Sequence, residues 1–368
     1  MSTDAEVAGF GAKPGAIGTP PQHYGNPLGE QRALAAGTAV VDLSDRAVLT
    51  ITGPDRLTWI DSLTSQSVAR MQPGESAETL LLDPTGRLEH VMRLIDDGVT
   101  TWILLEADAA PALHKWLDRM RFMLRVEIAD RSADYATLGT LGSPAIEATA
   151  PNGFALVWHD PWTSVVTGGH QYARTEHHPS NEWTYTELLI ERTRLDEAAA
   201  LPAAGTLALE ALRIAAWRPR LATEVDERTI PHELDWLRSA VHLNKGCYRG
   251  QETIAKVHNL GHPPRRLVLL HLDGSEGVLP VHGDVVTGVD KLGEPREVGE
   301  ITSAALHYEL GPIALAVVKR NTDATADLVV TAAEHGVAIA AAQEIIVPTD
   351  AGAEADIPRL PRLGAVRR

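Results

Sequence analysis

The residues best suited to chemistry lie in one short segment, residues 243–256, with the sequence LNKGCYRGQETIAK. It contains Cys247, which is the only cysteine of the chain, and two of the six lysines, Lys245 and Lys256. A thiol reacts as the thiolate, and cationic neighbours or a helix N-terminus lower its pKa from about 8.5 towards neutrality. Lys245 and Arg249 flank the cysteine on either side. The segment therefore predicts a reactive thiol.

The residues around the thiol favour access to it. A helix is predicted over 251–257, with Gly250 at its N-terminus and Glu252 in its first turn, where the helix dipole favours an acid. Gly246 and Gly250 remove side-chain bulk on both sides of Cys247, so a flat or bulky ligand could approach the backbone. The alternative is a packed turn, because a free cysteine is among the most buried residue types. The residues alone leave both interpretations open.

Two other groups of polar residues have less specific patterns. His258 and His262 have the i, i+4 spacing of a metal pair, but Gly261 and the prolines at 263–264 interrupt the helix that would align them. The acidic segment 223–233 offers general bases, although an exposed acidic turn is the commoner meaning of such a run. Its acids are Glu224, Asp226, Glu227 and Glu233.

Composition excludes several classes of protein. A chain of 368 residues with 44% hydrophobic content predicts two or three domains. The formal charge of −16, from 33 basic and 49 acidic residues, argues against general binding of nucleic acid. One cysteine excludes an intrachain disulfide, a four-cysteine zinc site and a complete four-thiolate iron–sulfur site. No apolar run approaches the roughly 18 to 20 residues that span a bilayer, so we expect a soluble, cytoplasmic protein without membrane attachment.

The hydrophobic pattern predicts how these residues are positioned. Residues 46–131 alternate as strand, helix, hairpin strands, helix and strand, with a turn signal at 96–98, which indicates a ferredoxin-like unit. Residues 205–217 predict a helix, and 135–205 are otherwise irregular. From 261 to 347, short strands separated by Gly, Pro and Asp predict a β-barrel. Residues 1–22 and 348–368 have no periodic pattern and are expected to be a flexible leader and a disordered tail.

The segment KGCYRGQE at 245–252 resembles the signature of YgfZ-type folate-binding proteins, K-G-C-[YF]-x-G-Q-E, at all seven specified positions. These proteins are relatives of the glycine cleavage system T-protein, an aminomethyltransferase. The resemblance extends to residues 23–63, with the junction ITGPDR, to TEVDERTIP at 223–231, and to the strands beyond 262. The tails and residues 135–180 lie outside it. What it implies is an α+β fold, a cloverleaf of three domains around a central hole that receives tetrahydrofolate.

The resemblance also implies domain boundaries. A mixed α/β folate-binding domain of the T-protein type would comprise residues 23–45 and 132–260. The ferredoxin-like domain would be residues 46–131, and the barrel residues 261–347.

The resemblance implies site residues as well. Cys247 would be the functional thiol and Lys245 its cationic neighbour. The supporting motif and the acidic segment would contribute further contacts, from Tyr248, Gly250, Gln251, Glu252 and Asp226. Glu187 aligns with a folate-contacting glutamate and could accept hydrogen bonds from the pterin's donor edge, the alternative being a surface glutamate. Between 243 and 266 the chain carries five basic side chains and one acid, and Arg265 and Arg266 are candidates to bind the folate carboxylates.

Departures from the T-protein pattern bear on the activity. The T-protein carries an acidic pair after a Gly-Gly hairpin, and one aspartate is needed for aminomethyl transfer. Here the corresponding positions are His90 and Val91, and Glu89 stands one place too early for the same side of the strand. The resemblance therefore predicts an accessory protein for iron–sulfur cluster assembly or repair, with iron–sulfur client or assembly proteins as partners. The alternatives are a folate-dependent aminomethyltransferase or other one-carbon transferase, and an oxidant sensor based on Cys247.

Overall fold

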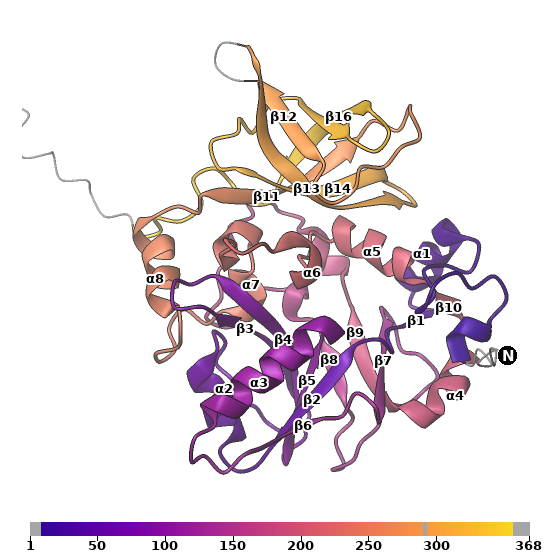
Figure 1. Ribbon diagram of the computed structural model, residues 1–368, viewed down its shortest axis with the longest axis vertical. Helices are drawn as coiled ribbons and strands as arrows, with labels where there is room; N and C mark the ends of the chain where they lie inside the picture. The colour runs from indigo at the N-terminus through magenta and orange to yellow at the C-terminus, as the bar shows by residue number, and fades with distance from the viewer. Residues whose placement is uncertain (1–8, 290–292, 356–368) are drawn as a thin grey trace, which may run out of the picture.

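The computed structural model describes residues 9–289 and 293–355, which form two β-sheets, a closed barrel and the helices between them. Figure 1 shows the barrel at one end of the molecule, with α5 and α6 beneath it and both sheets beyond these helices. The α+β class and the C-terminal barrel predicted from the sequence are confirmed. Among the described residues, no helix is long and apolar enough to cross a membrane.

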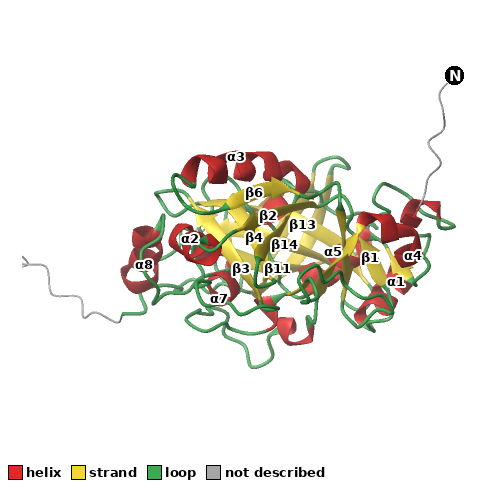
Figure 2. Ribbon diagram, turned by 90° about the horizontal axis from the view of Figure 1, so that it is seen from below, coloured by secondary structure: helices red, strands yellow, loops and turns green. Residues whose placement is uncertain are grey.

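The small sheet has the order β3-β4-β5-β2-β6 and antiparallel pairing throughout. Its five strands come from the segment expected to be ferredoxin-like and number one more than in a βαββαβ unit. Helices α2 and α3 contribute Trp59, Ile60, Leu113 and Leu117 to the core on one face of this sheet, and Figure 2 shows α3 above β6. The bounds are β2 Ala47–Thr52, α2 Arg56–Leu63, β3 Ser76–Leu82, β4 Leu88–Asp96, β5 Thr100–Leu105, α3 Ala110–Met120 and β6 Glu127–Asp130.

The central sheet has the order β10-β1-β7-β9-β8, with β1 and β10 parallel and the other pairs antiparallel. Its strands are drawn from both sides of the small sheet's segment in the sequence. The bounds of these elements are α1 Pro27–Ala35, β1 Val40–Asp42, β7 Tyr135–Thr140, β8 Val157–His159, β9 Thr186–Glu191, α4 Leu195–Ala199, β10 Ala203–Ala204, α5 Thr206–Ala215, α6 Leu221–Glu224, α7 Leu237–Ala240 and α8 Gln251–Leu260.

The barrel closes in the order β11-β14-β13-β12-β15-β16. Along β11, Val268, Leu270 and Leu272 point into the barrel, whereas Leu267 and Leu269 join the main core shared with the rest of the molecule. This alternation follows from the period of two in a strand and attaches the barrel to the helices below it. The bounds are β11 Arg265–Leu272, β12 Val285–Val289, β13 Pro295–His307, β14 Gly311–Lys319, β15 Leu328–Ala332 and β16 Val337–Ile345.

Both terminal segments differ from the expectation of flexibility wherever they are described. Phe10 is buried in the core, and Lys13 Nζ donates hydrogen bonds to the carbonyl oxygens of Ala199 and Leu201. At the other end, Ala351 is buried, and the Glu354 amide donates to His258 O at the end of α8. These segments carry few apolar residues, but each places one of them in the core. Residues 1–8 and 356–368 lie outside the described residues.

The pH dependence of stability can be predicted from His232, which is fully buried. Burial lowers its pKa to about 3, whereas the ordinary value is 6.5. As the pH falls below 6.5, His232 therefore becomes protonated in the unfolded chain but stays neutral in the folded chain, and the free energy of unfolding decreases. We expect His232→Gln to reduce the stability lost between pH 6.5 and 5 by about 1.5 kcal/mol. Urea unfolding at both pH values measures this, and an equal loss in both proteins would contradict it.

Candidate functional site

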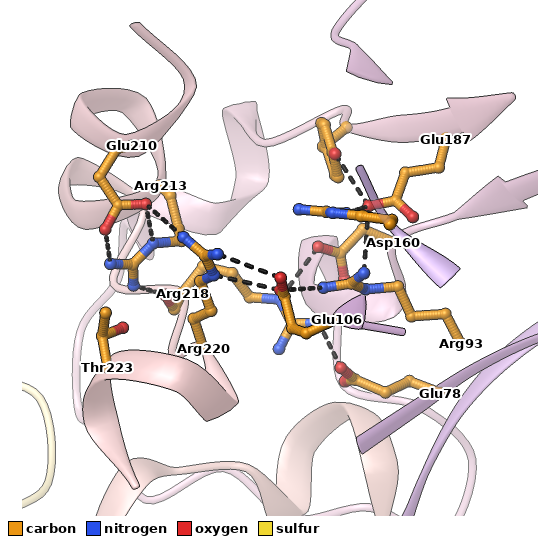
Figure 3. Close-up of polar contacts among 12 residues, drawn as sticks. Glu78, Arg93, Glu106, Asp160, Glu187, Glu210, Arg213, Arg218, Arg220 and Thr223 are labelled. Carbon is orange, nitrogen blue, oxygen red and sulfur yellow. Dashed lines mark hydrogen bonds and ion pairs between the residues drawn. The ribbon is translucent and has the colours of Figure 1, made fainter. Parts of the chain in front are cut away.

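A cavity of about 250 Å³ lies between the small sheet and the central sheet, and we call it the central cavity. Aromatic and aliphatic side chains line part of it, among them Trp158, Trp183, Tyr185 and Trp236. Charged side chains of both signs line the rest, and Figure 3 shows most of them directed towards one another. They are Asp45, Arg46, Glu78, Arg93, Glu106, Asp160, Glu187, Glu210, Arg213, Arg218 and Arg220.

Glu187 is the sequence-predicted site residue that the structure places in this cavity. It lies on β9 and is fully buried. Its Oε1 accepts hydrogen bonds from Arg46 Nη1 and, at 2.9 Å, from the Tyr185 hydroxyl. Its Oε2 is buried and has no hydrogen-bond partner among the described residues. The surface-glutamate alternative is therefore wrong, and one carboxylate oxygen is buried without a partner in the described part of the chain.

The local sequence explains how Glu187 is held. Gly139 is its cross-strand partner on β7. A Cβ at Gly139 would lie only 2.9 Å from the Tyr185 hydroxyl oxygen, so a larger residue would displace the tyrosine that donates to Glu187. Burial and the negative charge of Glu187 both raise the pKa of Tyr185, which keeps its hydroxyl protonated as a donor.

Three cavity arginines come from the end of α5 and the segment after it. Arg218 Nε donates to Asp160 at 3.0 Å and its Nη2 donates to Glu78. Arg220 donates to both oxygens of Glu106, each at 3.1 Å, and the third member, Arg213, donates to Glu210 and Glu224. The chain passes through a left-handed conformation after α5, since Trp217 has a φ of 59°. This reversal directs the arginines that follow into the cavity.

These ion pairs determine the protonation of the cavity acids. Burial would raise the pKa of Glu106, but the guanidinium groups of Arg46, Arg220 and Arg93 outweigh burial and hold the pKa below its usual range. The pKa of Glu210 is lowered in the same way, because Arg213 outweighs the effect of burial. Both acids therefore remain ionised near neutral pH.

Strand β4 places an apolar residue where the T-protein pattern has its acidic pair. Val91 lines the central cavity, as does Arg93 two residues further along the same strand. The pairing of β3 with β4 shifts register between Leu81 and Leu82. Glu89 is directed to the outside, where both its oxygens accept hydrogen bonds from Arg249. Glu89 is therefore directed away from the central cavity, which Val91 lines.

The KGCYRGQE segment lies apart from the central cavity, because none of residues 245–252 is among the described residues that line it. Cys247 is exposed. Lys245 Nζ donates to the carbonyl oxygens of Asp61, Thr64 and Gln66, at 2.6 to 2.8 Å. The three ammonium hydrogens are thereby directed at backbone around the end of α2. Lys245 is a structural anchor of the loop in this conformation, and the flanking Arg249 pairs with Glu89.

The other motif residues shape and support this loop. Gly250 has a φ of 84° at the start of α8, and a Cβ there would meet Asp83 O at 2.7 Å in the β3–β4 turn. Gln251 Nε2 donates to the carbonyl oxygens of Lys245 and Gly246, both at 3.3 Å. Tyr248 is buried, and Glu252 is exposed in the first turn of α8 as predicted. The motif thus presents Cys247 on a loop held by hydrogen bonds from Lys245 and Gln251.

The anchoring role of Lys245 gives a prediction for stability. Lys245→Met would leave three backbone carbonyls without their charged donor, so we expect the free energy of unfolding to fall by about 2 to 3 kcal/mol. Lys256→Met is the matched control, because Lys256 is exposed on α8 and its loss should change stability by less than about 0.5 kcal/mol. Urea denaturation measures the free energy of unfolding of both variants, and equal stability would refute the anchoring role of Lys245.

Two sequence-predicted groups lie elsewhere and have other partners. Asp226 accepts hydrogen bonds from Arg265 at 2.7 and 2.9 Å, and these bonds hold its pKa well below the usual range despite partial burial. Arg265 also donates to Glu233, so its ion pairs with Asp226 and Glu233 join the acidic segment 223–233 to β11. Arg266 is fully buried and donates to Thr322 O and Gln343 Oε1. Neither arginine lines the central cavity. The proposed partners for folate carboxylates therefore secure the barrel instead.

The two histidines with metal-pair spacing also have separate partners. His258 Nδ1 lies 3.1 Å from the Tyr172 hydroxyl, and His262 Nδ1 lies 2.8 Å from Ala351 O. No group of three or more His, Cys, Asp or Glu that could hold a metal ion occurs within the described ranges.

Comparisons with known proteins identify the class to which this fold corresponds. No family model matches the chain. A putative chloroplastic transferase of Arabidopsis thaliana is 25% identical over 303 residues, which cover 75% of this chain and 65% of the plant protein, less than two thirds of its length. An aminomethyltransferase of Rippkaea orientalis is 26% identical over 315 residues, 79% of this chain and 81% of that protein.

A solved structure shows the fold more directly. The glycine cleavage system aminomethyltransferase T from Bartonella henselae superposes with a TM-score of 0.67 over 89% of this chain and 91% of that one, at 17% identity. The chain therefore has the multidomain fold of aminomethyltransferase T. In sequence it is similar to several aminomethyltransferases, at 25 to 27% identity.

Proposed function

We propose that this chain binds tetrahydrofolate in the central cavity and acts as an accessory protein in iron–sulfur cluster assembly or repair. The observation that carries the folate proposal is the buried Glu187, whose Oε2 has no hydrogen-bond partner in the described part of the chain. A pterin carries an exocyclic amine beside a ring N–H, and an ionised carboxylate is a strong acceptor for both.

The shape of the cavity fits the head of a folate. Trp158, Trp183 and Trp236 line the cavity and give a bicyclic ring apolar contacts, with Arg93, Tyr185 and Arg218 covering one face of each indole. The volume of about 250 Å³ is slightly below the range of about 300 to 1,000 Å³ that is usual for ligand pockets. We expect the cavity to enclose the pterin and leave the glutamate tail outside. Bound tetrahydrofolate would supply ring nitrogens able to carry a one-carbon unit.

Apart from Glu187, four of the five acids that line the cavity are paired with arginines, which favours binding over transfer of the one-carbon unit. A general base works best when its pKa lies near the operating pH and a lone pair is free. Glu106 and Glu210 are paired with arginines and have lowered pKa values. Glu78 and Asp160 are both held by Arg218. Val91 contributes no acid from β4. We therefore expect binding without turnover.

Titration of tetrahydrofolate into the purified chain tests this proposal. Isothermal titration calorimetry should show saturable binding, and addition of a glycine-derived aminomethyl donor should give no transfer of a one-carbon unit. Transfer from the donor would support the second candidate, an aminomethyltransferase, which the similarity to aminomethyltransferases favours. Absence of binding would refute both.

The iron–sulfur role depends on Cys247, which is exposed on the loop anchored by Lys245. This position leaves the thiol open to a client or assembly protein in the cytoplasm. We expect wild-type protein to restore the activity of an iron–sulfur enzyme in cells that lack this chain, and Cys247→Ala at equal abundance to leave the activity at the level of the unrescued cells. Equal rescue by both proteins would show that the thiol is dispensable.

A further inference from the structure

Three buried polar atoms of the central cavity lack hydrogen-bond partners among the described residues. One is an acceptor, Glu187 Oε2, and two are donors, Arg93 Nη1 and Arg218 Nη1. A buried donor or acceptor without a partner costs about 1 to 3 kcal/mol. Because all three residues line the same cavity, a ligand that satisfies these atoms must offer a donor to Glu187 and acceptors to the two arginines.

Arg93 stands directly beside the acceptor. Its Nη1 lies 3.5 Å from Glu187 Oε1, which is close enough for charge attraction but leaves the N–H without a hydrogen bond. The guanidinium lies over the ring of Trp158, at 5.6 Å from the centroid. Arg93 is also the cross-strand partner of Glu78 on β3. The donor is therefore fixed on a strand, next to the carboxylate that would hold the pterin.

Arg218 is less suited to this role. Its Nε and Nη2 are held by Asp160 and Glu78. Its guanidinium lies between the rings of Trp162 and Trp236, at 5.2 and 5.7 Å from their centroids. No ion pair joins Arg218 to Glu187 among the described residues, whereas Arg93 forms one.

We propose that Arg93 determines ligand specificity by donating a hydrogen bond to the 4-oxo group of the pterin while Glu187 accepts from the neighbouring N–H. This inference rests on the proposed folate binding. A 2-amino-4-oxopteridine presents donors and a carbonyl acceptor side by side along one edge, which matches a carboxylate beside a guanidinium. A 4-amino analogue presents a donor to Arg93 and leaves the arginine unpaired, so the cavity rejects it.

The test compares tetrahydrofolate with the tetrahydro form of its 4-amino analogue, in which an amine replaces the 4-oxo group and the ring nitrogen N3 carries no hydrogen. Isothermal titration calorimetry under reducing, oxygen-free conditions gives both dissociation constants. We expect wild-type protein to bind tetrahydrofolate about 30-fold more tightly than the analogue. In Arg93→Met the affinity for tetrahydrofolate should fall by about 10-fold or more, and the ratio of the two dissociation constants should fall by about threefold or more, because only Glu187 still distinguishes the ligands.

Controls separate the specificity role from general effects. Arg249→Met removes an arginine outside the cavity and should keep the wild-type ratio of dissociation constants. If Arg93→Met does not fold, Arg93→Lys keeps the charge and should still prefer tetrahydrofolate, but by a smaller ratio. Equal affinity of wild-type protein for both ligands would overturn the inference and leave folate binding intact. Persistence of the wild-type ratio in Arg93→Met would also overturn it. Failure of tetrahydrofolate to bind wild-type protein would instead overturn the proposed function.

Discussion

Glu187→Gln is expected to bind tetrahydrofolate about 10- to 150-fold more weakly than wild-type protein, because a hydrogen bond to a charged group contributes about 1.5 to 3 kcal/mol. The substitution keeps the shape of the side chain but removes the negative charge, and it replaces one acceptor oxygen by an amide donor. If that NH₂ takes the place of Oε2, it would face the pterin donors instead of accepting from them. Calorimetric titration of both proteins measures the change in the dissociation constant.

The control for this variant must account for Arg46, which donates to Glu187 and is itself buried. Loss of the carboxylate leaves that cation unpaired and lowers stability. Tyr185→Phe removes only the hydroxyl that donates to Oε1, so it should alter binding by less than about tenfold. If Glu187→Gln does not fold, Glu187→Gln combined with Arg46→Met removes both charges. A folded variant that binds as tightly as wild-type protein would exclude Glu187 as the pterin acceptor.

The fold was predictable from sequence where local signals are strong. The turn at 96–98 joins β4 to β5, with Gly98 at a φ of 90°, as the Asp-Asp-Gly sequence indicated. Other elements gave weaker signals. Strand β16, which completes the barrel, contains four alanines among its nine residues, and alanine is depleted in strands. Strand β7 lies in the middle of the central sheet but has the sequence YATLGT, whose apolar residues are too few to mark it.

The site was predictable only in part, because a short motif is visible in consecutive residues, whereas a cavity is lined by residues that only the fold brings together. Glu187 was found by alignment with a related glutamate. Arg46, Arg93 and Arg218 were missed, since they come from three distant parts of the chain and only the fold brings them together. The available signal for Arg93 was its position between Val91 and Ile95 on one face of β4, where an arginine interrupts apolar residues. The basic residues that do cluster in sequence, Arg265 and Arg266, have structural partners instead.

The loss of Glu78 should destabilise the protein strongly. It is almost fully buried on β3 and accepts hydrogen bonds from Arg218, from Trp236 Nε1 at 3.1 Å and from the Ser239 hydroxyl at 2.8 Å. These donors come from the segment after α5 and from the residues in and before α7. One carboxylate thus joins the small sheet to the helical layer beneath the barrel.

Glu78→Met is therefore expected to lower the free energy of unfolding by about 3 to 5 kcal/mol, the usual result of removing one partner of a buried ion pair. Arg218 would keep Asp160 as a partner, so the lower end of this range is expected if that contact compensates. Urea unfolding measures the loss, with Glu334→Gln, at an exposed position in the turn between β15 and β16, as the control that should change stability by less than about 0.5 kcal/mol.

The double variant Glu78→Met with Arg218→Met separates two contributions to the lost stability. One is the unpaired Arg218 cation, and the other is the loss of the hydrogen bonds from Trp236 and Ser239. A buried pair replaced by apolar side chains of similar volume often leaves stability unchanged, whereas a single replacement does not. If the unpaired guanidinium dominates, the double variant should be more stable than Glu78→Met alone. If Trp236 and Ser239 dominate, the double variant should be no more stable, because their donors stay unsatisfied in both. A Glu78→Met protein as stable as wild type would show that this carboxylate does not hold the layers together.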